Sequence, residues 1–177
     1  VTVPNFQNKL FVGIKYGVDG KHVAMSIATK VDEKIFVESI DCQSVRNGNT
    51  WIISFLKEAD IEKVVIDGSG SQQILSDEIK DYGIKLKPVL PKVSDVVVAN
   101  NMFEQAVTSS KNICHNDQPS LKQIVTNCKR RAIGTNGGFG FKAMMEEHEI
   151  ALLDSVILAH WACATYKGVK KKQKISC

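Results

Sequence analysis

The sequence has no apolar run long enough to cross a membrane. Its longest runs, residues 96–99 and 150–153, are far shorter than the roughly 20 residues that a spanning helix needs. Residues 1–8 lack a basic segment followed by an apolar core, so they are not expected to be a signal peptide. The chain begins at Val1 rather than at methionine, which suggests a piece excised from a longer protein. We therefore expect no membrane anchorage.

The sequence also lacks the cysteine patterns of disulfide-rich and zinc-binding proteins. Its five cysteines are an odd number, and no two of them have C-x-x-C spacing. Buried or incidental thiols in a reducing cytoplasm explain them best. The cysteines are Cys42, Cys114, Cys128, Cys163 and Cys177.

Charge is almost balanced outside the C-terminus. The 177 residues include 23 basic and 19 acidic side chains. Five of the lysines lie within residues 167–177, which leaves 18 basic against 19 acidic residues elsewhere. With 44% hydrophobic residues, the composition is typical of one globular domain. We expect a linker at residues 1–8, a domain at residues 9–166 and a basic tail at residues 167–177, which is either merely solvated or binds nucleic acid or a protein partner.

Three consecutive strands are predicted near the start of the chain. Residues 10–16 are mostly apolar at both alternating sets of positions, which indicates a central strand covered on both faces. Short connections lead to further strands at residues 22–29 and 34–39, so two consecutive hairpins are expected.

Helices and strands alternate in the remainder. Helices are expected at residues 49–59, with Asn49 or Thr50 as the cap, and at 72–81, 93–109, 120–131 and 149–166. Strands are expected at residues 63–67, 84–89 and 111–115, and a glycine-rich loop or hairpin at residues 133–142. This order predicts an α/β fold with a mixed central sheet and helices on both faces. It is the plan of the RNase H fold, and the actin-like ATPases share a related strand order.

Two aspartates are candidates for chemistry. Asp67 ends a predicted apolar strand, at the edge where α/β sheets commonly build sites, although it could merely cap the following turn. Asp154 lies on the last predicted helix beside Ile150 and Leu158, and a carboxylate on an apolar face needs a partner. The two suit a two-metal phosphodiesterase with Mg²⁺ or Mn²⁺. Such a site normally has a third carboxylate, on the first strand.

Several short motifs follow one another along the chain. They are Val-Gly-Ile at residues 12–14, Val-Ile-Asp at 65–67, a histidine followed by Pro-x-Leu within 115–121, the pair Arg130 and Arg131, a Gly-Gly-Phe turn at 137–139 and the aspartate-bearing helix at 153–159. This order resembles the nuclease domain of tailed-bacteriophage terminase large subunits, a member of the RNase H-like superfamily. The resemblance covers residues 10–165.

The resemblance implies that Asp67 and Asp154 are the second and third metal-binding, catalytic carboxylates. The first is expected at position 15, where this chain has Lys15, and a further acidic residue is frequent at position 21, where it has Lys21. Asp19 lies between them in the turn and is not expected to take over. Because lysine cannot bind Mg²⁺ and its ammonium repels the ion, the chain as written should be strongly impaired as a nuclease.

An ammonium at position 15 could neutralise the two aspartates as a metal would. We therefore expect Lys15 to lie within ion-pairing reach of Asp67 or Asp154. This fits either a deliberate substitution or a degenerate gene.

Basic side chains near the glycine-rich turn could hold DNA phosphates, or they could form a solvated helix end. These are Lys129, Arg130, Arg131 and Lys142. His115 and His148 could bind a metal or move protons, although lone histidines are usually structural.

The function implied by the resemblance is a metal-dependent endonuclease that cuts double-stranded concatemeric DNA during phage DNA packaging, using two Mg²⁺ or Mn²⁺ ions. The implied partners are double-stranded DNA, an N-terminal terminase ATPase domain, the small terminase subunit and the portal protein, in the host cytoplasm. No G-x-x-x-x-G-K-[ST] motif occurs here, so the ATPase would be a separate domain. The alternatives are a non-catalytic RNase H-like DNA- or portal-binding module, favoured by Lys15 and Lys21, and a cellular RNase H-like resolvase or transposase.

Overall fold

A computed structural model of the chain describes residues 9–107, 113–115 and 147–167. Its strands are β1 (Leu10–Tyr16), β2 (His22–Val31), β3 (Lys34–Ser44), β4 (Ile61–Asp67) and β5 (Ile113–His115). Its helices are α1 (Thr50–Glu58), α2 (Ser71–Asp81), α3 (Val93–Gln105) and α6 (Glu147–Thr165), with a short 3₁₀ helix η1 (Val45–Asn47). No helix within these described ranges is long and apolar enough to cross a membrane.

The strands form one mixed sheet in the order β4-β1-β2-β3-β5. β1 and β2 pair antiparallel, as do β2 and β3, which confirms the two expected hairpins. β4 lies parallel to β1, and β5 lies parallel to β3. β1 is therefore a central strand, as its apolar sequence predicted.

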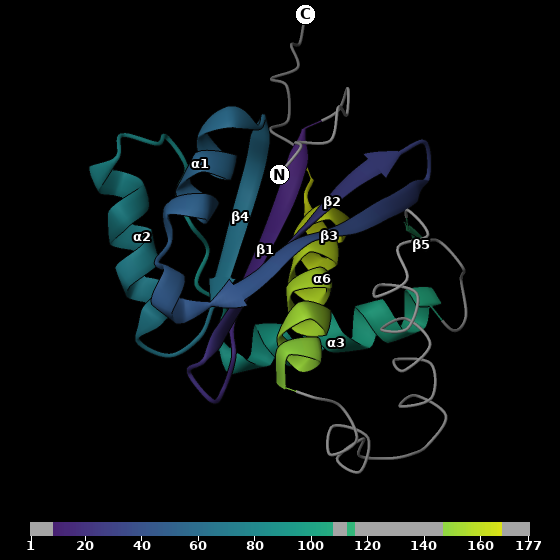
Figure 1. Ribbon diagram of the computed structural model, residues 1–177. Coiled ribbons are helices and arrows are strands. Elements are labelled where there is room, and N and C mark those ends of the chain that lie inside the picture. The colour runs from purple at the N-terminus through teal and green to yellow at the C-terminus, as the bar shows by residue number, and fades with distance from the viewer. Residues whose placement is uncertain (1–8, 108–112, 116–146, 168–177) are drawn as a thin grey trace, which may run out of the picture.

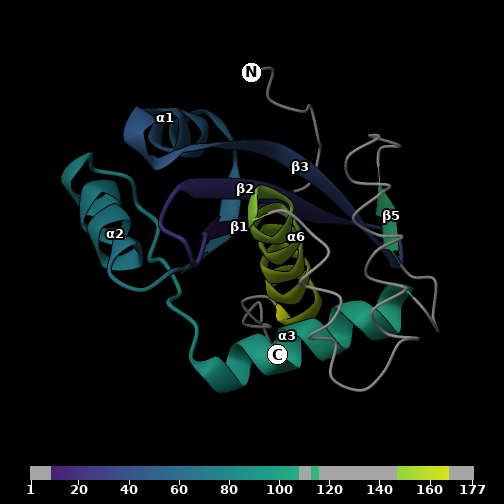
Figure 2. The same ribbon diagram turned by 60° about the horizontal axis from the view of Figure 1, so that its bottom comes forward.

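Helices cover both faces of this sheet, with α1 and α2 on one side and α3 and α6 on the other (Figures 1 and 2). The alternating side chains of β1 divide between the two layers. Leu10, Val12 and Ile14 belong to the core beneath α1 and α2, whereas Phe11 belongs to the core beneath α3 and α6. The mostly apolar sequence of β1 is explained by this burial on both faces.

The strand expected at residues 84–89 is not formed, and this prediction was wrong. Only Val89 joins the sheet, through an isolated parallel bridge to Val65. The Val89 N–H donates to the Val64 carbonyl and the Val89 carbonyl accepts from the Ile66 N–H, each at 2.9 Å. In a parallel ladder the next residue that could bond to β4 in each direction is two positions away, and Pro91 has no N–H to donate, so the ladder does not extend past Val89 toward α3.

Asn49 stands at the N-cap of α1 as expected, but its side chain makes no capping hydrogen bond. Instead, the Tyr16 hydroxyl donates to Asn49 Oδ1 at 2.8 Å, and Asn49 Nδ2 donates to Glu78 Oε1 at 2.6 Å. Burial, and then the nearby Glu78 carboxylate, raise the pKa of Tyr16 well above its ordinary value. These bonds tie the end of β1 to α1 and α2.

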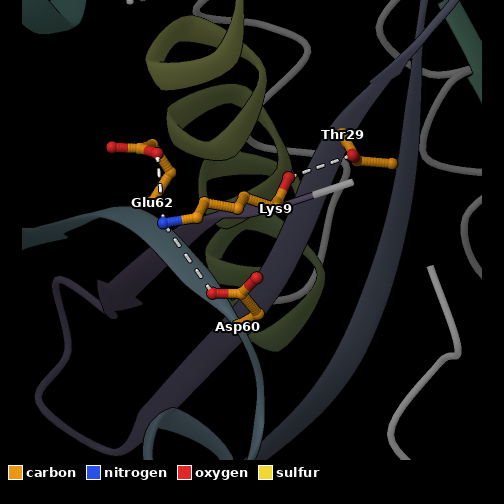
Figure 3. Close-up of polar contacts among 4 residues, drawn as sticks. All are labelled: Lys9, Thr29, Asp60 and Glu62. Atoms are coloured by element: carbon orange, nitrogen blue, oxygen red, sulfur yellow. Dashed lines mark hydrogen bonds and ion pairs between the residues drawn. The ribbon is translucent and has the colours of Figure 1, made fainter. Parts of the chain in front are cut away.

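The opposite end of β1 is held by a cluster of polar contacts around Lys9 (Figure 3). Lys9 Nζ lies 3.9 Å from Asp60 Oδ1 and 3.7 Å from Glu62 Oε1, and the Thr29 hydroxyl donates to the Lys9 carbonyl at 3.1 Å. These contacts join the beginning of β1 to β2 and to the beginning of β4.

Some expectations fall outside the described residues. They are the helix at residues 120–131, the glycine-rich segment at 133–142 and the end of the helix expected at 93–109, at residues 108 and 109. Of that last helix, Val93–Gln105 is formed as α3.

Candidate functional site

Lys15 and Asp67 stand side by side at the adjoining ends of β1 and β4. The two strands are parallel, and their register pairs Lys15 directly with Asp67. Lys15 Nζ donates to Asp67 Oδ2 at 2.7 Å. The side chains are 15% and 21% exposed, so water screens this ion pair only partly. The expected proximity of Lys15 to Asp67 is confirmed.

Both side chains lie on the face of the sheet that α6 covers. Along β4, Val65 belongs to the core beneath α6, and Asp67 follows two residues later on the same face. Along β1, Phe11 and Gly13 occupy that face, and Lys15 is the next residue in the series. The pair therefore lies between the sheet and α6.

α6 approaches β1 closely at Gly13. A Cβ atom at this position would lie 2.2 Å from the Ser155 carbonyl oxygen and 2.5 Å from the Ala159 nitrogen, so only glycine fits. The buried Ser155 hydroxyl is also 2.6 Å from the Ser26 hydroxyl on β2, and it donates to the Leu152 carbonyl at 2.7 Å. These contacts fix the position of α6 on the sheet.

Asp154 is half-buried on the same side of the sheet as Lys15 and Asp67. The Leu158 Cβ lies 3.0 Å from a Cβ built at Gly13, and the Ala151 Cβ lies 4.0 Å from one built at Gly17. Asp154 is located between these two residues along α6, as Lys15 is located between the two glycines along β1.

The direction of Asp154 follows from helix geometry. Successive residues of an α-helix are rotated by about 100°. Ser155 faces β2, and His160 contacts Phe103 of α3 edge-on, with ring centroids 5.4 Å apart. Asp154 lies on the other side of Ser155 from His160, so it is directed away from α3 and toward the β1 and β4 side of the sheet. The fold thus brings all three predicted positions to one region.

The side chains present there do not fit a divalent metal ion. The Asp67 oxygen that would be a ligand already accepts from the Lys15 ammonium, which would repel a cation. Across the described ranges, no group of three or more His, Cys, Asp or Glu residues is placed to hold a metal ion. Among the residues that the structure describes, the oxygen ligands that Mg²⁺ or Mn²⁺ would need are therefore not gathered around Lys15 and Asp67.

Neither Asp19 nor Lys21, the two other charged residues considered in the first hairpin, adds a metal ligand. Asp19 is exposed in the turn between β1 and β2, where its Oδ1 accepts from the Lys21 backbone N–H at 2.9 Å. Lys21 is exposed as well. Asp19 thus has the local role of a turn aspartate.

The remaining predicted site residues lie outside the described residues. They are Lys129, Arg130, Arg131 and Lys142, together with the side chains of His115 and His148. Their roles stay predictions.

Sequence reasoning missed the contribution of Gly13 and Ser155. Within an apolar strand, Gly13 was unremarkable, yet it sets how closely α6 approaches the candidate site. An isolated glycine inside a strand pattern is a signal of close backbone approach and could have identified it.

The described cysteines agree with the expectation of free thiols. Neither Cys42 nor Cys163 is part of a disulfide bond. Burial raises the pKa of each thiol to about 11, so neither is a ready nucleophile at neutral pH.

No protein-family model matches the sequence, and no curated protein matches it. Solved structures do match. The human cytomegalovirus terminase nuclease domain, soaked with Mn, is 11% identical, with 88% of this chain and 83% of that chain covered and a TM-score of 0.50. The large terminase of a thermophilic bacteriophage, in complex with ADP, is 14% identical, with 92% and 40% covered and a TM-score of 0.50.

Two further matches have lower scores. The nuclease domain of the bacteriophage SPP1 large terminase with bound Mn is 15% identical, with 68% of each chain covered and a TM-score of 0.42. Another structure of the thermophilic phage's large terminase has a TM-score of 0.47 at 15% identity, with 71% of this chain covered, and the chain spans only 33% of it. At these identities the similarity is one of fold. The two matches with a TM-score of 0.50 show that the chain has the RNase H-like α/β fold of terminase nuclease domains, with a mixed central sheet and helices on both faces.

Proposed function

We propose that this chain is the nuclease domain of a DNA-packaging terminase large subunit in which the Lys15 ammonium prevents metal ions from binding. One observation carries the proposal: the Lys15 ammonium lies 2.7 Å from the Asp67 carboxylate, beneath α6, on the C-terminal edge of β1 and β4. In this proposal residues 9–166 form the nuclease domain, residues 1–8 are a linker and residues 167–177 are a basic tail.

The reaction that we propose for the family is metal-dependent cutting of double-stranded concatemeric DNA. Position 15 would need to supply a carboxylate, with Asp67 and Asp154 as the other two metal-binding and catalytic groups. With Lys15 present, the ammonium takes the place of a cation, so the chain as written is a strongly impaired endonuclease. Manganese in the soaked cytomegalovirus domain supports Mg²⁺ or Mn²⁺ as the ions of the family.

The proposed context is a phage DNA-packaging motor in the host cytoplasm. The partners would be double-stranded DNA, an N-terminal ATPase domain of the same subunit, the small terminase subunit and the portal protein. The 40% coverage of the ADP-bound phage large terminase supports a larger parent chain, since more than half of that protein has no counterpart here.

The test is to replace the ammonium by an oxygen ligand. We expect Lys15→Asp to bind Mn²⁺ in calorimetry and to nick supercoiled plasmid in Mn²⁺, whereas the unaltered chain should do neither at a comparable level. Adding Lys21→Asp should strengthen Mn²⁺ binding if this position also supplies an oxygen.

Two controls make the test specific. Lys34→Asp changes the charge equally at an exposed position at the other end of the sheet, so it should gain no activity. Asp67→Asn or Asp154→Asn, combined with Lys15→Asp, should abolish the gain. A well-folded Lys15→Asp protein with unchanged Mn²⁺ affinity would contradict the proposed site.

The same ion pair also favours a second candidate, a non-catalytic module that binds DNA or the portal. Under this alternative, Lys15 preserves the charge balance of the site without cutting. Retained DNA or portal binding by the unaltered chain, together with no nicking even by Lys15→Asp, would support it.

A further inference from the structure

A basic pocket lies at the end of the sheet where β1 and β4 also carry the Lys15–Asp67 pair. The pocket has a volume of about 370 Å³ and is lined by Gly20, Lys21, His22, Ser44, Val45 and Arg46. Its residues come from the turn between β1 and β2 and from the end of β3 with η1. Sequence reasoning did not single out Arg46 at all.

The walls of this pocket carry positive charge without a carboxylate among the lining residues. Lys21 and Arg46 are both exposed. Among the described residues, the ion pairs involve Lys9 and Lys15, and none involves either of these two cations. Both are therefore available to an anion from solvent.

The backbone that carries the two cations is fixed by hydrogen bonds. The Val45 N–H donates to the Lys21 carbonyl at 2.9 Å, which ties the turn to η1. The Lys21 N–H donates to Asp19 Oδ1 at 2.9 Å, and the Arg46 N–H donates to Ser44 Oγ at 3.2 Å. The local donors are thus used internally, and the side-chain ammonium and guanidinium remain as the groups that can bind a ligand.

The pocket is close to the candidate site. Lys15 pairs with Ala24 on β2, and His22, two residues before Ala24, is the first residue of that strand and lies opposite Ser44 of β3. At about 3.3 Å per residue and about 4.8 Å between strands, the pocket lies on the order of 10 Å from Lys15. Phosphates of one DNA strand follow one another at a rise of about 3.4 Å along the helix axis, so a duplex that crosses the Lys15–Asp67 pair can present a neighbouring phosphate to the pocket.

We propose that Lys21 and Arg46 form a binding site for a backbone phosphate of duplex DNA, next to the phosphate presented to the Lys15–Asp67 region. The guanidinium of Arg46 can bind phosphate oxygens in a bidentate manner, and Lys21 adds a compact point charge. In this role Lys21 and Arg46 bind the phosphate rather than a base edge, so the site positions the duplex independently of sequence. The choice of DNA as the source of the phosphate rests on the proposed function.

The experiment measures duplex DNA binding by fluorescence anisotropy over a series of salt concentrations, with EDTA present so that cutting plays no part. Lys21→Gln with Arg46→Gln should flatten the log–log salt slope by about 0.9, because the contact with one phosphate is lost. Affinity at low salt should fall by roughly tenfold or more, equally for different sequences.

The matched control is Lys34→Gln with Lys80→Gln, which removes the same charge at exposed positions on the β2–β3 hairpin and on α2. It should leave the slope unchanged. Since all four side chains are exposed, both double variants should unfold at the same urea concentration as the parent.

Other outcomes would overturn the site. Equal slopes for the two double variants, or no duplex binding by the parent chain, would exclude it. Amide NMR shifts of Gly20 and Arg46 with inorganic phosphate but not with a short duplex at matched ionic strength would assign the pocket to a free anion instead. If the pocket variant flattens the slope but Lys15→Asp does not nick plasmid, the phosphate site is supported and the nuclease proposal fails. If Lys15→Asp nicks plasmid but the two double variants have equal slopes, the nuclease proposal is supported and the phosphate site fails.

Discussion

At position 15 the fold brings an ammonium to within 2.7 Å of the Asp67 carboxylate, with both side chains mostly shielded from water. A charge-assisted hydrogen bond of this kind contributes about 1.5–3 kcal/mol, and removing one partner leaves the other poorly solvated. Lys15, which prevents metal binding at the proposed site, therefore also supplies the hydrogen bond and the opposite charge that the Asp67 carboxylate needs. This compensation explains why the RNase H-like fold accommodates lysine at a position where the family resemblance implies aspartate.

His160 allows a prediction about stability and pH. It is 3% exposed on α6, against Phe103, and burial lowers its pKa from 6.5 to about 4. Its Nδ1 atom has no hydrogen-bond partner among the described residues. The folded protein therefore holds this imidazole neutral, whereas the unfolded chain takes up a proton below about pH 6.5.

The sign follows from this difference. The stability contributed by neutral His160 is complete above about pH 6.5 and is lost as the pH falls toward 4, because only the unfolded state binds the extra proton. Between pH 7 and 5 this group should cost about 2 kcal/mol of unfolding free energy. Urea unfolding of His160→Phe at both pH values should show a loss of unfolding free energy between pH 7 and 5 that is smaller than the parent's by that amount. An identical dependence in parent and variant would contradict the assignment.

At the scale of elements, the contact between β1 and α6 depends on the absence of a side chain at Gly13. A methyl group there would meet the backbone of Ser155 and Ala159, which cannot turn aside as a flexible side chain can. We expect Gly13→Ala to lower the unfolding free energy by about 3 kcal/mol or more, at the upper end of overpacking effects.

Gly17→Ala is the matched control, just beyond the end of the same strand and on the same face. Its Cβ would meet the end of the Asp19 side chain at 3.1 Å, which can move aside, and the His22 carbonyl oxygen at 3.5 Å and Ala151 Cβ at 4.0 Å, which are ordinary contact distances. We expect it to cost less than about 1 kcal/mol. Urea titrations compare the two variants, and equal losses would show that α6 can shift away from β1 at little cost.

At the scale of the whole molecule, the last described residues lie far from the candidate site. The ring of Tyr166 packs against Phe11 near the beginning of β1, with centroids 5.1 Å apart, whereas Lys15 is near its end. Tyr166 therefore lies at the opposite end of the sheet from the candidate site, and the lysines within residues 167–177 come directly after it in the sequence. Any DNA affinity that they add should be independent of the pocket at Lys21 and Arg46.

Truncation after Tyr166 tests the tail. If all five lysines engage duplex DNA, the log–log salt slope should flatten by roughly 4 to 5 on their removal. Folding should be retained because α6 and the Tyr166 contact remain. Truncation after Ala164 serves as a comparison, since it also removes that contact and should destabilise the domain. Identical slopes before and after the first truncation would assign the tail to a protein partner or to solubility.

Local sequence patterns were sufficient for most of the fold. The apolar run of β1 matches its observed bounds because burial on both faces demands apolar residues at nearly every position. The positions of α1, α2 and α6 followed from helical spacing, within two residues of their ends. The strand expected at residues 84–89 failed because only Val89 pairs with β4, and how far two distant segments pair is set by tertiary packing rather than by a local apolar pattern.

The site depended on contacts that no local pattern contains. The family resemblance suggested that Lys15 and Asp67 are neighbours, but their 2.7 Å contact results from the parallel register of β1 and β4, which brings together residues 52 positions apart along the chain. Likewise, the placement of Asp154 above that pair depends on the close approach at Gly13. Sequence by itself determined which residues could carry charge and which must be buried, because burial and backbone preference act locally. Tertiary structure alone decided which charges meet, because pairing between distant strands and helices is set by packing across the whole core.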